Sequence, residues 1–139
     1  MVVRIGIIDD NETSQKVLST ILSEIEIEEK IPLNIFNFFS PVDYLLQEKV
    51  FDVLILDSLF KSYPLNLNSL ALSKIAKEKD NNTKVVLISE YANEDFLKLI
   101  NDKNIDYYTS KRIEEDKMKN FLKRILEEAK GLENSLQEK

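Results

Sequence analysis

The stretch Phe51-Asp52-Val53-Leu54-Ile55-Leu56-Asp57-Ser58-Leu59-Phe60 decides the fold. Its central residues, 53–56, form an unbroken apolar block that is too short for an isolated helix. Such a block is typical of a central strand that is covered on both faces. Asp57 stands at the carboxyl end of this strand, where open α/β sheets bind their ligands. Asp57 could also simply cap the turn that follows, and the rest of the chain has to decide between the two interpretations.

Four other segments have the composition of buried or half-buried strands: residues 2–8, 33–39, 84–88 and 104–110. Helices are predicted between them. The first is capped by Asn11 and has apolar positions at Val17, Leu18, Ile21, Leu22 and Ile25. A short helix runs from Ser40-Pro41 to about Glu48, and a third covers residues 69–79. The fourth is capped by Asn93 and carries Phe96, Leu97, Leu99 and Ile100, and the last begins at about Glu114. Five strands that alternate with five helices predict an α/β domain, with a parallel sheet covered by helices on both faces.

The composition excludes several classes of site. A chain of 139 residues has the size of one domain. It has no cysteine and no histidine, which removes disulfides, thiolate nucleophiles, imidazole bases and the usual zinc ligands. With only Gly6 and Gly131, it has no glycine-rich phosphate loop.

The charge and the hydropathy bear on partners and location. The net charge of −6 disfavours binding to nucleic acid. No apolar run reaches the ~20 residues of a membrane span, and residues 1–4 do not open a signal peptide. We therefore expect a cytoplasmic protein that binds neither nucleic acid nor a membrane.

Chemically active side chains follow four of the predicted strands. In chain order they are Asp9 with Asp10, then Asp57, Ser89 and Lys111. Because parallel strands end at one edge of the sheet, these side chains are expected to meet there. Crowded carboxylates require a cation, and Mg²⁺ accepts carboxylate and phosphate oxygens. A carboxylate can also act as a nucleophile toward a phosphoryl group, with a hydroxyl and a lysine contacting the phosphoryl oxygens. Each residue alone also has a structural explanation, as a helix cap or a surface lysine.

These residues resemble the motifs of the receiver domains of two-component response regulators, over residues 2 to about 130. The 22-residue step from Ser89 to Lys111, with Tyr108 three residues before the lysine, is similar to the family's layout. The resemblance implies a flavodoxin-like, doubly wound sheet of order 2-1-3-4-5. It also implies a receiver domain over residues 1–130, followed by a tail or an extension of the last helix over residues 131–139.

The resemblance implies the following roles. Asp57 accepts a phosphoryl group from a histidine kinase or a phosphotransfer protein, with Ser89 and Lys111 contacting that group. Asp9, Asp10, Asp57 and the backbone carbonyl of Leu59 hold Mg²⁺. Ser89 and Tyr108 act as a switch pair that changes contacts with a downstream protein. Such a protein is not an enzyme beyond the phosphorylation and dephosphorylation of its own Asp57.

The sequence departs from the family pattern at several positions. Arg112 replaces the proline that usually follows the lysine, and Glu90 replaces the small residue that usually follows the switch hydroxyl. The loop after Asp57 lacks the usual glycine. Apolar Leu59 cannot orient a hydrolytic water, so we expect slow loss of the phosphoryl group. The main alternative is a receiver-like interaction module that works unphosphorylated, favoured by Glu90 and Arg112. A phosphohydrolase with Asp9 as its nucleophile is a further alternative, but Asn11 stands where such enzymes place a second acid, and we expect no room for a cap domain.

The last helix carries an apolar seam with steps of four and three: Met118, Leu122, Ile125, Ala129, Leu132 and Leu136. One interpretation is ordinary packing onto the sheet as far as Ala129, followed by a frayed tail after Gly131. The other is a homodimer through this helix and its extension. With no effector domain after residue 130, output is expected to depend on protein contacts.

Overall fold

The structure, a computed structural model, describes residues 2–57, 69–89 and 103–137, with side chains as far as Gly131. Its strands are β1 (Val3–Ile8), β2 (Leu33–Phe38), β3 (Val53–Asp57), β4 (Lys84–Ser89) and β5 (Tyr107–Ser110). Its helices are α1 (Glu12–Glu29), α2 (Pro41–Leu45), α3 (Ser69–Lys79) and α5 (Glu115–Gln137). The strands form one parallel sheet of order β2-β1-β3-β4-β5, as predicted. The helix predicted after Asn93 lies outside the described residues.

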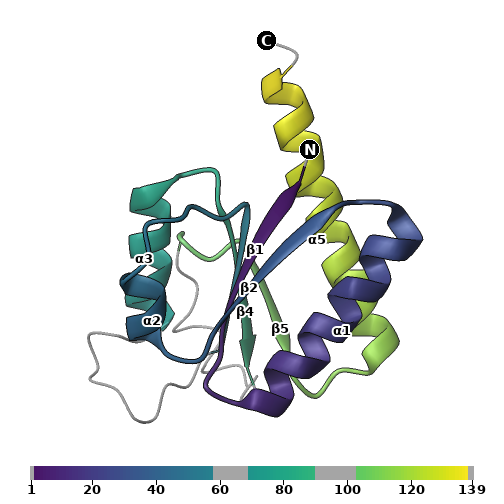
Figure 1. The fold of residues 1–139 in the computed structure, drawn as a ribbon, viewed down its shortest axis with the longest axis horizontal. Helices are drawn as coiled ribbons and strands as arrows, with labels where there is room; N and C mark the ends of the chain where they lie inside the picture. Colours follow the sequence, from purple (N-terminus) through teal and green to yellow (C-terminus); the bar gives the residue numbers. More distant parts are fainter. Residues whose placement is uncertain (1, 58–68, 90–102, 138–139) are drawn as a thin grey trace.

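The helices cover the sheet in two layers, with α1 and α5 on one face and α2 and α3 on the other (Figure 1). Alternate side chains of the central strands enter the two layers, because successive side chains of a strand point to opposite faces. Ile55 and Val86 belong to the core under α1 and α5, whereas Leu54 and Leu87 belong to the core under α2 and α3. The unbroken apolar runs in the sequence therefore reflect strands that are buried on both faces.

The predicted caps begin two of the helices. The Asn11 side chain accepts a hydrogen bond from the Ser14 N–H at 2.8 Å, and α1 starts at Glu12, directly after Asn11. The Ser40 hydroxyl oxygen accepts one from the Asp43 N–H at 3.0 Å, with Pro41 opening α2. Both contacts satisfy backbone donors that a helix leaves unpaired at its start.

Two predicted boundaries were wrong by three residues. Helix α2 ends at Leu45 and not near Glu48, because the Gln47 side chain bonds to the local backbone. Its amide donates to the Tyr44 carbonyl, and its oxygen accepts from the Lys49 N–H at 2.6 Å. Strand β5 begins at Tyr107 and not at residue 104.

The late start of β5 has a cause at Asp106. The Asp106 carboxylate accepts a hydrogen bond from the Val85 N–H at 2.8 Å, so a side chain takes the place of a backbone partner. The Lys77 ammonium holds the same carboxylate oxygen at 2.7 Å. The segment before Tyr107 is therefore tied to β4 without being part of the ladder.

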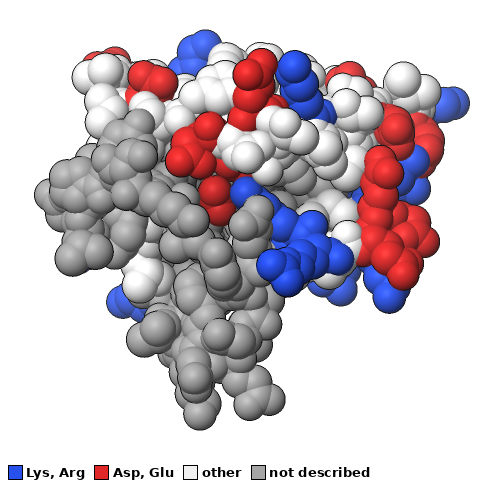
Figure 2. Space-filling model, turned by 90° about the horizontal axis from the view of Figure 1, so that it is seen from below, with Lys and Arg blue, Asp and Glu red and all other residues white. Residues whose placement is uncertain are grey.

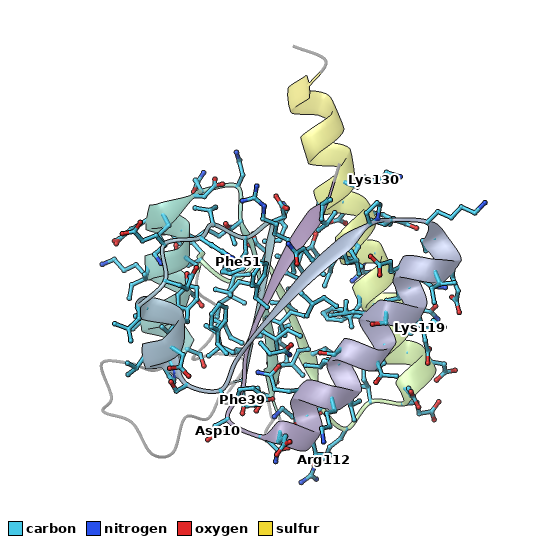
Figure 3. The ribbon with its side chains drawn as sticks, viewed as in Figure 1. Asp10, Phe39, Phe51, Arg112, Lys119 and Lys130 are labelled. Atoms are coloured by element: carbon cyan, nitrogen blue, oxygen red, sulfur yellow. The ribbon has the colours of Figure 1, made fainter. Side chains whose placement is uncertain are left out.

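An aromatic cluster fills the space between the sheet and α2. The ring of Phe51 meets those of Phe36 and Phe38 edge to face, with centroids 5.5 and 5.7 Å apart. Figure 3 shows Phe51 on the side of the sheet that faces α2 and α3. Edge-to-face pairs add to the stability that burial of the rings provides.

Helix α5 packs on the sheet through most of its predicted seam. Met118, Leu122, Ile125 and Ala129 are all buried in the core beneath α1 and α5. The helix then continues without a break to Gln137 and extends past the sheet (Figure 1). The packing interpretation is thus confirmed for these four residues, whereas the side chains of Leu132 and Leu136 lie outside those described. A division at residue 130 and a homodimer stay predictions.

Ion pairs join α1 to α5 along their exposed sides. Lys119 lies between the two helices in Figure 3 and pairs with Glu24 and Glu28, and Lys123 pairs with Glu28 at 3.0 Å. In the part of the chain that the structure describes, no helix is both long enough and apolar enough to cross a membrane. A cytoplasmic location stays a prediction.

Candidate functional site

The predicted site residues lie at the carboxyl ends of the strands. Asp57 is the last residue of β3 and Ser89 the last of β4, while Asp9 and Lys111 directly follow β1 and β5. Asp9 and Ser89 are fully buried and Asp57 is 8% exposed, whereas Asp10 is exposed. Four elements that are distant in the sequence thus deliver polar side chains to one edge of the sheet.

The Lys111 ammonium joins two of the acids. Its Nζ donates to Asp9 Oδ2 at 2.9 Å and lies 3.3 Å from Asp57 Oδ2. The backbone N–H of Lys111 donates to the Ser89 carbonyl at 2.9 Å, which fixes where the chain leaves β5. Burial lowers the pKa of Lys111, but the hydrogen bond to Asp9 and the charges of Asp57 and Asp9 outweigh it, so the pKa lies above its ordinary value. Lys111 is therefore a cation at neutral pH.

Three carboxylates lie close together at this edge of the sheet. One oxygen each of Asp9, Asp10 and Asp57 lies within 4.8 Å of the others. Figure 2 looks at this edge and shows acidic and basic side chains next to each other in its middle. Three acids and one lysine leave an excess of two negative charges, which matches a divalent cation. An all-oxygen donor set suits Mg²⁺, so the residues present fit this metal.

Gln15 of α1 is a buried contributor that sequence reasoning missed. Its Nε2 donates to the carbonyls of Ile7 and Asp9, each at 3.1 Å, and to that of Phe38 at 2.9 Å. Its Oε1 accepts a hydrogen bond from Asn37. Gln15 thereby joins the ends of β1 and β2 and holds the backbone of Asp9. The available signal was its position one turn before Leu18, on the apolar stripe of α1.

A second buried contact holds the backbone of Asp57. The Ser69 hydroxyl, at the start of α3, donates to the Asp57 carbonyl at 2.6 Å. The Ser73 hydroxyl in turn donates to the Ser69 carbonyl at 2.7 Å. The first turn of α3 therefore fixes the end of β3.

The two predicted switch residues lie on one face of the sheet. In the parallel register Leu87 pairs with Tyr108 and Ser89 with Ser110, so Ser89 and Tyr108 share the face covered by α2 and α3. Tyr108 packs partly buried against that core, and burial raises the pKa of its hydroxyl. Arg112 is exposed and points away from the sheet (Figure 3). Leu59, Glu90 and the loop after Asp57 lie outside the described residues.

Comparison with known proteins supports the fold. The chain matches no family model and no curated protein. It is similar in structure to the BeF3-activated receiver domain of DrrB, with a TM-score of 0.73 and 22% identity over 91% of this chain and 99% of that one. It is also similar to the response regulator DrrB of Thermotoga maritima, an OmpR/PhoB homologue, with a TM-score of 0.70 and 22% identity over 92% of this chain and 54% of that one.

A third similar structure is the signal receiver domain of an HD domain-containing protein from Pseudomonas fluorescens Pf-5. The TM-score is 0.73 and the identity 19%, over 94% of this chain and 99% of that one. At these identities, the likeness establishes a shared fold and not a shared activity.

Proposed function

We propose that this chain, which has the fold of response regulator receiver domains, accepts a phosphoryl group on Asp57 with Mg²⁺ as cofactor. The observation that carries the proposal is the ammonium of Lys111, 2.9 Å from Asp9 and 3.3 Å from Asp57. A lysine fixed beside a nearly buried carboxylate provides a positive charge where phosphoryl oxygens would arrive. A carboxylate that only capped a turn would not require it.

In the proposed reaction, an Asp57 carboxylate oxygen attacks the phosphorus of a donor. A P–O bond to Asp57 forms, and the P–N bond of a phosphohistidine or the P–O bond of acetyl phosphate breaks. The bond electrons leave with the imidazole or acetate, so no redox partner is needed. The chain takes part only in the modification of its own Asp57.

The metal would be held by Asp9, Asp10 and Asp57, whose oxygens lie within 4.8 Å of one another. Bound there, Mg²⁺ supplies positive charge to the transferring phosphoryl oxygens. The Leu59 carbonyl is a further proposed ligand. Asn11 and Gln15 contribute by holding Asp9, because the Asn11 N–H donates to Asp9 Oδ1 at 2.9 Å and Gln15 donates to the Asp9 carbonyl.

The proposed output is a change in protein contacts. A phosphoryl group on Asp57 carries nearly two negative charges in place of the single charge of the carboxylate, together with three acceptor oxygens, which the Ser89 hydroxyl and Lys111 would contact. Because Tyr108 lies on the same face as Ser89, a shift at the site can change the packing of its ring. Partners would be a histidine kinase or phosphotransfer protein and a downstream protein target. That the chain acts without a further domain stays a prediction.

The decisive experiment is to incubate the protein with acetyl phosphate and Mg²⁺ and to map any acyl phosphate. We expect one phosphoryl group per chain on Asp57, lost in D57N and after removal of Mg²⁺ with EDTA. The matched control is D43N, which makes the same change at an exposed acid of α2. It should be phosphorylated like the natural sequence.

Two outcomes would overturn the proposal. A folded protein that takes up no phosphoryl group from several small donors would favour an interaction module that works unphosphorylated. A label on Asp9 with continuous turnover would favour a phosphohydrolase.

A further inference from the structure

A polar cavity lies at the opposite edge of the sheet from Asp57. Its volume is about 680 Å³, and it is lined by the last turns of α3, the start of β4 and the residues before β5. The lining side chains are Lys74, Lys77, Glu78, Asn81, Asn82, Lys84, Lys103, Asn104 and Asp106. This volume is within the usual range for small-molecule sites, about 300–1,000 Å³.

The charge of the cavity is opposite to that of the chain. Among the described residues, four lysines and two acids line it, a surplus of two positive charges in a protein of net charge −6. Asp106 is already engaged, because Oδ2 accepts from the Lys77 ammonium at 2.7 Å and from the Val85 N–H at 2.8 Å. The Lys77 ammonium also donates to the Thr83 carbonyl at 2.6 Å. This locked pair forms the wall of the cavity and is not available to a ligand.

The other three lysines keep their charge for a ligand. Among the residues that the structure describes, no carboxylate pairs with Lys74, Lys84 or Lys103 within 4.0 Å. The carboxyl end of α3 borders the cavity and opposes an anion, but it contributes only about half a negative charge, which is less than the charge of one lysine. Three lysines that line one cavity and have no described carboxylate within 4.0 Å repel one another, and a multivalent anion would reduce that repulsion.

We propose that this cavity binds a small anion with more than one phosphoryl group, of the pyrophosphate class. Lysines are point charges suited to phosphoryl oxygens, and the side-chain amides of Asn81 and Asn82 are additional donors. Among the residues that the structure describes, those that line the cavity are all charged or amide side chains, so they offer a nucleobase no aromatic ring for stacking. The recognised chemistry is therefore the phosphoryl charge itself, whether free or attached to a nucleoside.

The test is a titration with pyrophosphate in EDTA at constant ionic strength, followed by the amide NMR shifts of the whole chain. We expect saturable shifts at residues 74–84 and 103–106, without saturable shifts at Asp9, Asp57 and Lys111. A triple variant, K74Q/K84Q/K103Q, should bind about tenfold more weakly or worse. The matched control, K117Q/R124Q/K130Q, removes the same number of charges from α5 and should stay within about twofold.

A gain-of-affinity variant guards against loss of folding. E78Q removes the acid of the cavity that has no ion pair among the described residues and should bind pyrophosphate more tightly. A parallel titration with ADP should give an affinity similar to that of pyrophosphate. Equal weakening in both triple variants, shifts confined to the Asp57 edge, or ADP binding more than about tenfold tighter than pyrophosphate would each overturn the proposal.

Discussion

Replacing Gln15 with leucine tests whether a buried amide holds together the ends of β1 and β2, next to Asp9. The side chain is 2% exposed, and its Nε2, with two hydrogens, serves three carbonyls. Leucine has a similar volume, so the change removes the donor without opening a large cavity. Buried carbonyls that lose their donor cost about 1–3 kcal/mol each, and burial of the leucine offsets part of this. The Phe38 carbonyl still accepts a hydrogen bond from the Asp9 N–H at 3.1 Å, so it keeps a donor in the variant. We therefore expect the free energy of unfolding to fall by about 2 kcal/mol.

Urea unfolding followed by circular dichroism measures this loss, and thermal unfolding should show a decrease in Tm of about 8 °C for a chain of this size. The matched control is Lys16→Leu, the same kind of change at the next, exposed position, which should alter stability by less than about 0.5 kcal/mol. If Mg²⁺ binds at Asp9 as proposed, its affinity should also fall about tenfold in the Gln15 variant. Equal stability of the two variants would refute the role given to Gln15.

Three further predictions follow from packing and charge. In Gly6→Ala the new Cβ would lie 3.0 Å from a leucine side chain of β3, costing about 1–3 kcal/mol in urea unfolding, whereas Gly131→Ala, with no atom within 4 Å, should be neutral or stabilising. Lys111→Met removes the positive charge among the acids and should bind Mg²⁺ more tightly by calorimetry; weaker binding would contradict the proposed metal site. Hydrogen bonds from Lys119 and Lys123 of α5 hold the pKa of Glu28 below its ordinary 4.5. Above pH 4.5, Lys119→Gln should therefore unfold more easily than the natural sequence. This difference in the free energy of unfolding should disappear as the pH falls through the lowered pKa, and it should shrink in high salt. A difference independent of pH would exclude this ion pair as its cause.

The sequence predicted the sheet well because its signals are local. Apolar runs bounded by polar residues identified all five strands, and Asn11 and Ser40 correctly marked the starts of two helices. The boundaries that were wrong depend on single side chains. Gln47 ends α2 through bonds to the nearby backbone, and Asp106 replaces a ladder contact with a carboxylate. Neither effect has a periodic signature in the sequence. The predicted helix α2 therefore ended too late, and the predicted strand β5 began too early.

The site was predicted to the extent that it depends on strand order. Once strands are parallel, residues at their carboxyl ends must converge, and Asp9, Asp57 and Lys111 do so. Gln15 and Ser69 were missed because their role depends on which backbone carbonyls the folded chain brings to them. A buried polar residue on an apolar helix stripe is the feature that indicates such contacts from sequence.

The position of Lys111 connects the charge of the site to the shape of the loop after β5. Its ammonium contacts the carboxylates that would hold a metal, and its backbone N–H donates to the carbonyl of Ser89. The next residue is also tied to the end of β5, because the Arg112 N–H donates to Ser110 Oγ at 3.1 Å. A cation that binds the carboxylates would compete with Lys111 for them. The Lys111 ammonium would then be free to bind another anion, or the loop after β5 would shift, or both. If Asp57 is phosphorylated as proposed, its phosphoryl oxygens would bind that ammonium, and occupancy of the site would then affect the loop that leads into α5.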